Sequence, residues 1–171
     1  MIDKIYLLLD NVRSTQNVGS ILRSADGLGI DSVYLCGYTP YPIMPEGTDS
    51  RLPHLAASIN RRIHKTALGA ELTQRWYNND STVETISKLR DRTTIIAALE
   101  QSSRSVDLRS YRPDPQTNNL CLIVGNELDG ISEDILKMCD ICLEIKMSGA
   151  KESFNVSVAA AIALYQLKNM L

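Results

Sequence analysis

Short apolar runs alternate with segments of helical periodicity along almost the whole chain. Apart from Thr94, the runs at 5–9, 94–99 and 120–124 are continuously apolar, which is typical of strands that are buried on both faces of a sheet. Between such runs, apolar residues recur every three or four positions, as they do in 17–28. This alternation predicts an α/β fold, in which a parallel sheet carries helices on both faces.

The remaining elements follow from the same patterns. Further strands are predicted near 30–36, 72–77 and 141–145, and further helices near 55–65, 81–90, 132–138 and 154–170. Ser81 and Glu84 form a capping-box signature at the start of one helix. Two long connections remain, at 37–53 and 101–119, and connections of this length in a compact domain are commonly functional.

Length and hydropathy limit the class of protein. The 171 residues suit one domain, which we expect to span 1–171. No apolar run approaches the ~20 residues of a membrane span, and the first ten residues hold too short an apolar stretch for a signal peptide. We therefore expect no membrane partner and a cytoplasmic location.

Neither the cysteines nor the histidines form a metal-binding pattern. Cys139 and Cys142 have the C-x-x-C spacing, but a zinc site needs a second ligand pair, and His54 and His64 lack a suitable spacing. Free thiols beside apolar runs behave as small buried hydrophobes. We expect no metal.

Charge alone does not identify a partner. The formal net charge is −2, so no global field attracts nucleic acid. Five basic residues nevertheless fall in one stretch whose only internal acid is Glu71: Arg51, Arg61, Arg62, Lys65 and Arg75. From charge alone, a solvated helix face is the favoured interpretation, and a surface for phosphates is the alternative.

Three polar stretches leave predicted strands. Ligands of open α/β sheets bind beyond the carboxyl ends of strands, so these stretches are candidate sites. The first, 17–23, opens a helix whose N-terminus favours anions. For this stretch alone, Asn17 as a helix cap and Arg23 in a surface ion pair are the favoured interpretation. The second, 124–130, contains two glycines but lacks the phosphate-binding and dinucleotide-binding fingerprints. Its acidic neighbours suit a neutral or cationic ligand, and a tight turn without a ligand is the alternative.

The third stretch, 145–157, runs from a strand through a loop to a helix start rich in serine and asparagine. Ser153 could cap the helix, but capping does not explain why Asn155 and Ser157 follow so closely.

In this order and at these separations, the three stretches resemble the signature motifs of the SpoU/TrmH family of RNA ribose methyltransferases, part of the SPOUT superfamily. The first resembles Asn-x-Gly-x-x-x-Arg, the second Gly-Asn-Glu-x-x-Gly, and the third Ile-Pro-Met…Ser-Leu-Asn-Val-Ser-x-Ala. The resemblance runs from about residue 5 to the C-terminus. Two residues depart from the pattern: Lys146 replaces a proline and Phe154 replaces a leucine.

The resemblance implies a fold, a cofactor and a reaction. The C-terminal segment would form a deep trefoil knot that holds S-adenosylmethionine, largely through main-chain groups of Leu99, Gly125, Ile145, Met147 and Ser153. The methyl group would pass to a ribose 2′-hydroxyl of RNA, either tRNA or rRNA. In that reaction Arg23 would clamp the target phosphate and hydroxyl, and Asn17 would orient Arg23 or the ribose. The rest of the polar wall would come from Glu127, Ser153 and Asn155.

The family resemblance also implies partners. A homodimer would form through the alanine-rich final helix, with RNA lying across the junction. We expect no separate RNA-binding domain, so RNA would contact this domain directly, through Arg23, Arg51, Arg61, Arg62 and Lys65. Two alternatives remain: an inactive SPOUT-fold RNA-binding or assembly module, supported by Lys146, and an unrelated flavodoxin-like nucleotide binder, which fits the sheet but not the motifs.

Overall fold

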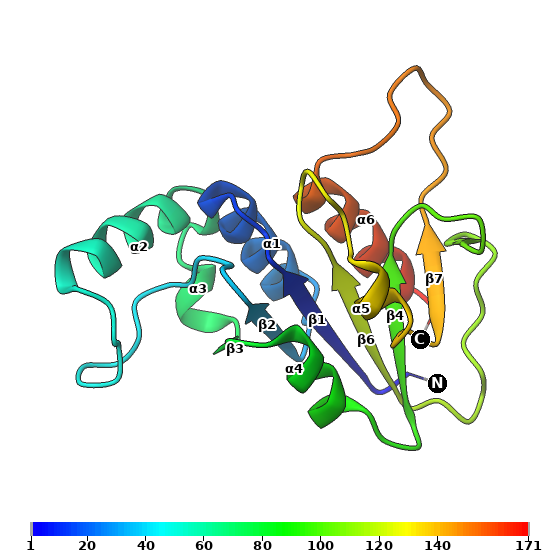
Figure 1. The fold of residues 1–171 in the computed structure, drawn as a ribbon, viewed down its shortest axis with the longest axis horizontal. Coiled ribbons are helices and arrows are strands. Elements are labelled where there is room, and N and C mark those ends of the chain that lie inside the picture. Colours follow the sequence, from blue (N-terminus) through cyan, green and yellow to red (C-terminus); the bar gives the residue numbers. More distant parts are fainter. Residues whose placement is uncertain (1, 171) are drawn as a thin grey trace.

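A computed structural model describes residues 2–170, which form one parallel sheet with helices on both faces (Figure 1). The strand order is β3-β2-β1-β6-β4-β7-β5. The strands are β1 (Lys4–Asp10), β2 (Ser32–Cys36), β3 (Trp76–Asn79), β4 (Thr94–Leu99), β5 (Val106–Asp107), β6 (Asn119–Val124) and β7 (Ile141–Glu144). The helices are α1 (Thr15–Gly27), α2 (Pro53–Ala67), α3 (Ala70–Thr73), α4 (Thr82–Leu89), α5 (Glu133–Leu136) and α6 (Val156–Lys168).

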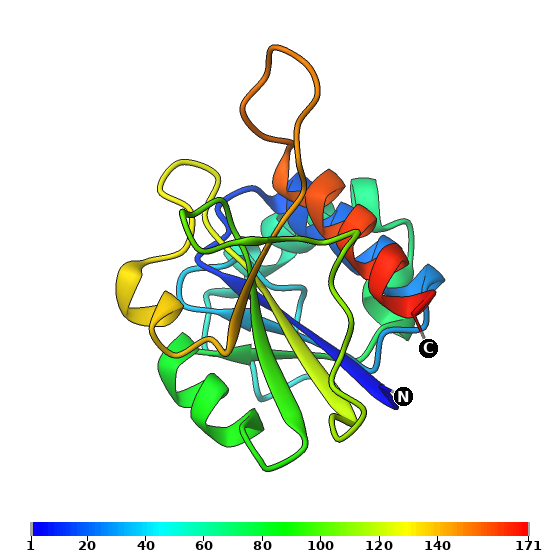
Figure 2. The same ribbon diagram turned by 90° about the vertical axis from the view of Figure 1, so that its right-hand side faces the viewer.

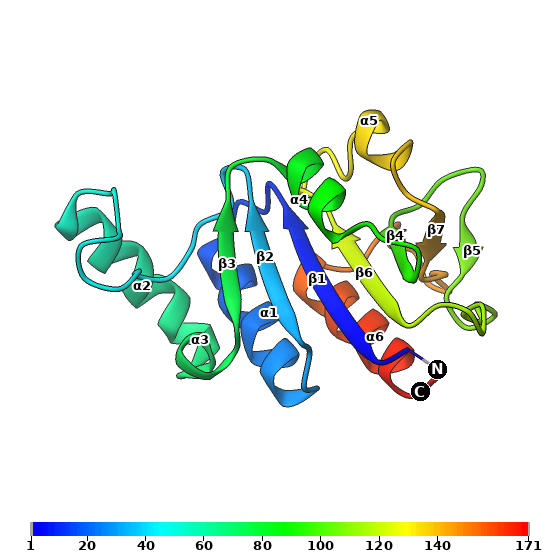
Figure 3. The same cartoon turned by 90° about the horizontal axis from the view of Figure 1, so that it is seen from below.

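The central strands are buried on both faces, as their continuous apolar runs predict. Leu7 and Leu9 of β1 point to one face, and Leu8 points to the other, yet all three are fully buried. On the first face the apolar core includes α1 and α6, and on the second it includes α4 and α5 (Figure 3). Each leucine removed from water in this way contributes about 2 kcal/mol to folding. The parallel sheet with helices on both faces confirms the α/β prediction.

Asn17 and Ser153, considered above as alternative helix caps, do not cap their helices. Ser14, not Asn17, caps α1 by accepting a hydrogen bond from the Asn17 N–H. Asn155, not Ser153, caps α6 by accepting one from the Ser157 N–H at 2.9 Å. Ser81 caps α4 as predicted. The side chain of Asn17 and the hydroxyl of Ser153 are therefore not used as caps.

The strand predicted at 72–77 is wrong in its first half. Residues 70–73 form the short helix α3, and β3 starts only at Trp76. The buried Glu71 carboxylate binds the His64 ring at 2.5 Å and the Gly69 N–H at 3.0 Å, which ties this turn to the end of α2. Leu72, which suggested a strand, is 83% exposed.

The connections beyond β4 and β7 lie side by side. The 101–119 connection contains the two-residue strand β5, which pairs with β7. No apolar run in the sequence predicts this strand. Residues 145–155 leave β7 as a loop that projects from the body of the domain (Figure 2). The trefoil knot expected for this segment stays a prediction.

Candidate functional site

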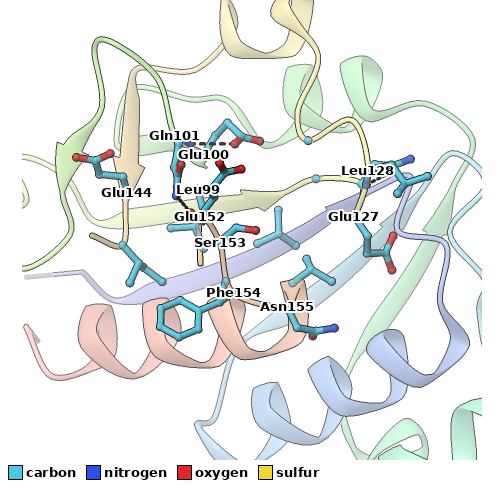
Figure 4. A pocket seen from close by; sticks show the side chains of 17 residues that line it. Leu99, Glu100, Gln101, Glu127, Leu128, Glu144, Glu152, Ser153, Phe154 and Asn155 are labelled. Carbon is cyan, nitrogen blue, oxygen red and sulfur yellow. Dashed lines mark hydrogen bonds between the residues drawn. The ribbon is translucent and has the colours of Figure 1, made fainter. Parts of the chain in front are cut away.

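A cavity of about 530 Å³ opens at the carboxyl ends of β4, β6 and β7 (Figure 4). This is the edge of the sheet at which ligands of α/β folds bind, and the volume suits a cofactor-sized molecule. The cavity is lined by Leu99, Glu100, Gln101, Val124, Gly125, Asn126, Glu127, Leu128, Gly130, Glu144, Ile145, Glu152, Ser153, Phe154, Asn155, Val156 and Ala159.

The glycine loop after β6 is folded too tightly for side chains at its ends. A Cβ atom at Gly125 would lie 2.5 Å from the carbonyl carbon and oxygen of Gly130 and 2.7 Å from Cγ1 of Ile131. Gly130 has a φ of +67°, a conformation that favours glycine. Asn126 and Gly130 pair across the loop through reciprocal backbone hydrogen bonds. The loop therefore presents main-chain atoms to the cavity at close range.

A chain of hydrogen bonds joins all three sequence motifs at the edge of the cavity. The Asn17 side-chain amide donates to Glu127 Oε1 at 2.8 Å, and its Oδ1 accepts from the Asn155 amide at 3.1 Å. Asn155 in turn accepts from the Ser157 hydroxyl at 2.7 Å. Because the Glu127 carboxylate can only accept when ionised, it fixes the orientation of the Asn17 amide, which in turn fixes that of Asn155.

Glu127 is held as an anion against the start of α1. Its oxygens also accept from the Arg13 and Ser14 N–H groups, at 2.9 and 3.1 Å. Burial raises the pKa of Glu127, but the hydrogen bonds from the Arg13 N–H, the Asn17 amide and the Ser14 N–H outweigh it, so the pKa is lowered. A carboxylate with a lowered pKa is a weak proton acceptor, and Glu127 therefore suits positioning better than general base catalysis.

The cavity wall is acidic. Four of its lining residues are glutamates, Glu100, Glu127, Glu144 and Glu152, and the lining includes no lysine or arginine among residues 2–170. Figure 4 shows Glu127 and Asn155 on the side of the cavity nearest α1. Such a wall favours a ligand with positive charge, in line with the preference inferred from the sequence.

The structure brings most of the predicted site residues together. Leu99, Gly125, Ile145 and Ser153 line the cavity. Met147 is not a lining residue, although it belongs to the same loop. Arg23 is exposed and also lies outside the lining. It follows Asn17 by six helical residues, about 9 Å along α1 and about 120° around it, so the structure does not bring Arg23 into the wall of the cavity.

Gly19 of the first motif serves the packing of two helices. A Cβ atom there would lie 2.2 Å from Thr66 Oγ1 and 2.3 Å from the Ile63 carbonyl oxygen, both on α2. Thr66 Oγ1 also donates to the Gln16 carbonyl at 2.9 Å. The end of α2 is thereby held beside the start of α1, next to Asn17.

The predicted basic surface divides into two parts. Arg61, Arg62 and Lys65 are exposed on α2. Arg51 instead lies over the Tyr41 ring and binds Asp49, with side-chain contacts of 2.6 and 2.8 Å. It also donates to the Tyr41 and Pro42 carbonyls, which leaves one N–H for any other partner. RNA binding by Arg51 stays a prediction, but its contacts stabilise the 41–51 loop.

The thiols are free and unreactive. Burial raises the pKa of Cys36 to about 11 and that of Cys139 to about 12, so both stay protonated near neutral pH. Within residues 2–170, no three His, Cys, Asp or Glu side chains are grouped so that they could hold a metal ion. No helix in the same range is long and apolar enough to cross a membrane.

Sequence reasoning missed five polar residues of the cavity: Glu100, Gln101, Asn126, Glu144 and Glu152. Glu100, which directly follows β4, accepts a hydrogen bond from the Ile131 N–H at 3.0 Å and so fixes the end of the glycine loop. Asn126 donates to the hydroxyl of Tyr38, a residue of the 37–53 connection. The signals available for Glu100 and Asn126 were their positions, directly after a strand and inside a motif.

Comparisons with known proteins agree with this geometry. Residues 4–165 match the model of the SpoU rRNA Methylase family. The tRNA (guanosine(18)-2′-O)-methyltransferase of Aquifex aeolicus is 30% identical over 162 residues, which cover 95% of this chain and 67% of that protein. A curated TrmH family relative from Staphylococcus aureus (strain COL) is 28% identical, and the chain spans 57% of its length.

Solved structures share the fold. An AdoMet-bound rRNA methyltransferase from Sinorhizobium meliloti superposes with a TM-score of 0.80 at 23% identity, over 100% of this chain and 58% of that one. The Aquifex aeolicus TrmH/SpoU tRNA modifying enzyme gives a TM-score of 0.75 at 26% identity, over 98% and 75% of the two chains. With the three motifs assembled at one cavity and the family model matched over nearly the whole chain, the protein belongs to the SpoU rRNA methylase family.

Proposed function

We propose that this protein is an RNA methyltransferase that transfers the methyl group of S-adenosylmethionine to a ribose 2′-hydroxyl of tRNA or rRNA. The observation that carries the proposal is the hydrogen-bonded chain Glu127–Asn17–Asn155 at the edge of the cavity, which joins all three motifs. Asn17 is 110 residues from Glu127 and 138 residues from Asn155 in the sequence.

The cavity fits the cofactor in shape and charge. Leu99, Val124, Ile145, Val156 and Ala159 give it apolar walls, and the glycine loop offers main-chain groups. When bound, S-adenosylmethionine supplies a methyl group on a positively charged sulfur. The acidic wall of the cavity favours that cation, while the apolar residues exclude water from the region around it.

The polar residues would orient the ribose. Asn17 and Asn155 keep hydrogen-bonding capacity beyond the contacts described, and both are fixed in orientation by Glu127. Because Glu127 has a lowered pKa, we assign the hydroxyl proton to an RNA phosphate oxygen or to water. Arg23 would clamp the target phosphate, since a guanidinium stays charged and grips two oxygens together.

Lys146 does not support the inactive alternative. Its side chain is exposed and lines a second cavity of about 420 Å³, between α6 and residues 107–109, rather than the candidate site. The departure from the family pattern therefore puts no additional charge into the wall of the site.

The proposal includes a homodimer with α6 at its interface. Its support is an exposed apolar stripe along this helix, formed by Val158 (45%), Ile162 (38%) and Tyr165 (62%). The alanines suggested from the sequence, Ala159, Ala160 and Ala163, do not form this stripe. Ala160 and Ala163 are buried in the core of their own subunit, and Ala159 lines the candidate cavity.

Other expectations from the sequence remain part of the proposal. RNA would follow Arg61, Arg62 and Lys65 along α2 to the site, since α2 ends beside Asn17. The knot is supported by the contact of residues 145–155 with the 101–119 connection, where the Gln101 amide donates to the Glu152 carbonyl at 2.6 Å. The single-domain organisation, the absence of a metal and the cytoplasmic location stay predictions.

The direct test is transfer of a labelled methyl group. RNA from a strain that lacks this gene would be incubated with the protein and S-adenosylmethionine labelled in the methyl group, then digested to nucleosides. We expect the label in a 2′-O-methylnucleoside. Label on a base would contradict the ribose assignment, and cofactor binding without transfer to any RNA would favour the inactive module.

A further inference from the structure

Tyr38 is an exposed aromatic residue at the edge of the sheet where the candidate site opens. It follows β2 by two residues, at the start of the 37–53 connection, and is 60% exposed. A tyrosine ring left this open to water adds little to the apolar core and offers an exposed aromatic face on which a planar group can stack.

The backbone on both sides of Tyr38 is held in place. Gly37 has a φ of +64°, and a Cβ atom there would lie 2.1 Å from Asn11 Oδ1. The same Oδ1 accepts from the Tyr38 N–H at 3.1 Å. Thr39 is almost fully buried, and its hydroxyl donates to the Cys36 carbonyl at 2.7 Å. Tyr38 therefore projects from an anchored turn.

The far end of the side chain is anchored as well. The Tyr38 hydroxyl accepts a hydrogen bond from the Asn126 amide, and Asn126 lines the cavity between Gly125 and Glu127. Asn126 is itself fixed, because its Oδ1 accepts from the Leu128 N–H at 2.8 Å. The ring thus lies beside the residue next to Glu127, with its orientation set at both ends.

We propose that the Tyr38 ring is a stacking surface for the base of the target nucleotide, and so positions its ribose against Asn17 and the cavity. This inference rests on the proposed function. Proteins that act on one nucleotide of an RNA loop commonly stack its unpaired base on an aromatic side chain. A ring already fixed in orientation does so at a low entropic cost.

If the Tyr38 hydroxyl only supports the glycine loop (a bracing role), the expected effects of substitution differ. If Tyr38 only held the glycine loop, its removal would alter the cavity and weaken cofactor binding. Loss of the hydroxyl alone would then be as damaging as loss of the whole ring. A stacking role requires the ring and tolerates loss of the hydroxyl.

The test uses Tyr38→Ala, Tyr38→Phe and Tyr38→Trp, with Tyr77→Ala as a matched control at an exposed tyrosine of β3. Affinity for S-adenosylmethionine is measured by calorimetry, and KM and kcat are measured with RNA from the gene-deletion strain. We expect Tyr38→Ala to raise the RNA KM about ten- to a hundredfold at unchanged cofactor affinity. Tyr38→Phe and Tyr38→Trp should stay within a few-fold of wild type, as should Tyr77→Ala.

Each other outcome contradicts either the stacking role of Tyr38 or the proposed function. A wild-type RNA KM in Tyr38→Ala, in a preparation whose wild type transfers methyl groups, contradicts the stacking role alone. Equal losses in Tyr38→Ala and Tyr38→Phe, with weaker cofactor binding in both, replace stacking by bracing. No transfer by wild type to any RNA contradicts the proposed function and removes this inference with it.

Discussion

Gly125 leaves no room for a side chain, and this gives a sharp test of the cofactor site. Gly125→Val would force its side chain against the Gly130 carbonyl, 2.5 Å from the position of Cβ. We expect calorimetry to show no binding of S-adenosylmethionine, while circular dichroism shows a folded protein, because the clash lies in a surface loop. Gly149→Ala is the matched control, since a Cβ at Gly149 meets nothing within 4 Å. Wild-type affinity in Gly125→Val would exclude this cavity as the cofactor site.

Substitutions of Arg23 test its proposed role in methyl transfer. It lies outside the cavity lining, so Arg23→Ala should keep the cofactor affinity and lose methyl transfer by over a hundredfold, or about 3 kcal/mol of transition-state stabilisation. Arg23→Lys should restore little, because lysine lacks the planar fork. Single-turnover transfer measures both. The surface ion pair considered for Arg23 is not present among residues 2–170. If Arg23 were only a solvated surface residue, both variants would react at the wild-type rate.

Residue identities were easier to predict from the sequence than their contacts. The three motifs marked Asn17, Glu127 and Asn155 correctly as neighbours of one cavity. The cap predicted at Ser81 is confirmed, whereas the alternative that Asn17 caps its helix is wrong, because Ser14 stands three residues earlier and offers the same chemistry. The bond between Tyr38 and Asn126 could not be predicted, since it depends on which strand ends the sheet places side by side.

At the scale of elements, α2 should provide the electrostatic part of RNA binding. We expect the triple change Arg61→Ala, Arg62→Ala, Lys65→Ala to lower RNA affinity and to reduce the slope of log affinity against log salt by about two. Cofactor affinity should not change, because these residues lie outside the cavity.

A matched control for α2 lies on the other face of the sheet. Lys88 of α4 and Lys137, which follows α5, are exposed and paired with Glu84 and Asp134. Changing both to alanine should leave the salt slope as in wild type. An unchanged slope in the α2 triple variant would mean that its basic residues form a solvated face only.

Elements with a strong apolar period were predicted well, and short ones were not. The runs that became β1, β4 and β6 are apolar because both faces of each strand are buried. The 72–77 run misled because its leucine points to solvent and a buried Glu71 carboxylate, paired with His64, governs the turn. The two residues of β5 are too few to show a hydrophobic periodicity, and only their pairing with β7 makes them a strand.

For the whole molecule, we expect a dimer formed through α6. Light scattering should give twice the chain mass of 19.0 kDa at micromolar concentration. Ile162→Asp places a charge in the exposed apolar stripe and should yield a folded monomer. Val83→Asp is the control, because Val83 is exposed to a similar extent on α4. A wild-type mass of 19.0 kDa would contradict the dimer.

The overall strand order lies beyond what local patterns specify. Periodicity indicates a parallel sheet, but it does not indicate that β6 is inserted between β1 and β4, more than a hundred residues after β1. That insertion brings the glycine loop beside Asn17 and so assembles the site. The family resemblance, not the periodicity, provided the expectation that the three motifs would meet.

We propose that this chain methylates a ribose of cellular RNA, which mapping of ribose methylation in whole cells would detect. RNA would be compared between a strain that lacks the gene and the same strain complemented with the wild-type gene or with Gly125→Val. A 2′-O-methylated ribose resists alkaline cleavage of the following phosphodiester bond. We predict one position in a tRNA or rRNA that resists cleavage with the wild-type gene, and that is cleaved both without it and with Gly125→Val. Identical cleavage patterns in all three strains would mean that the protein does not methylate a ribose of cellular RNA.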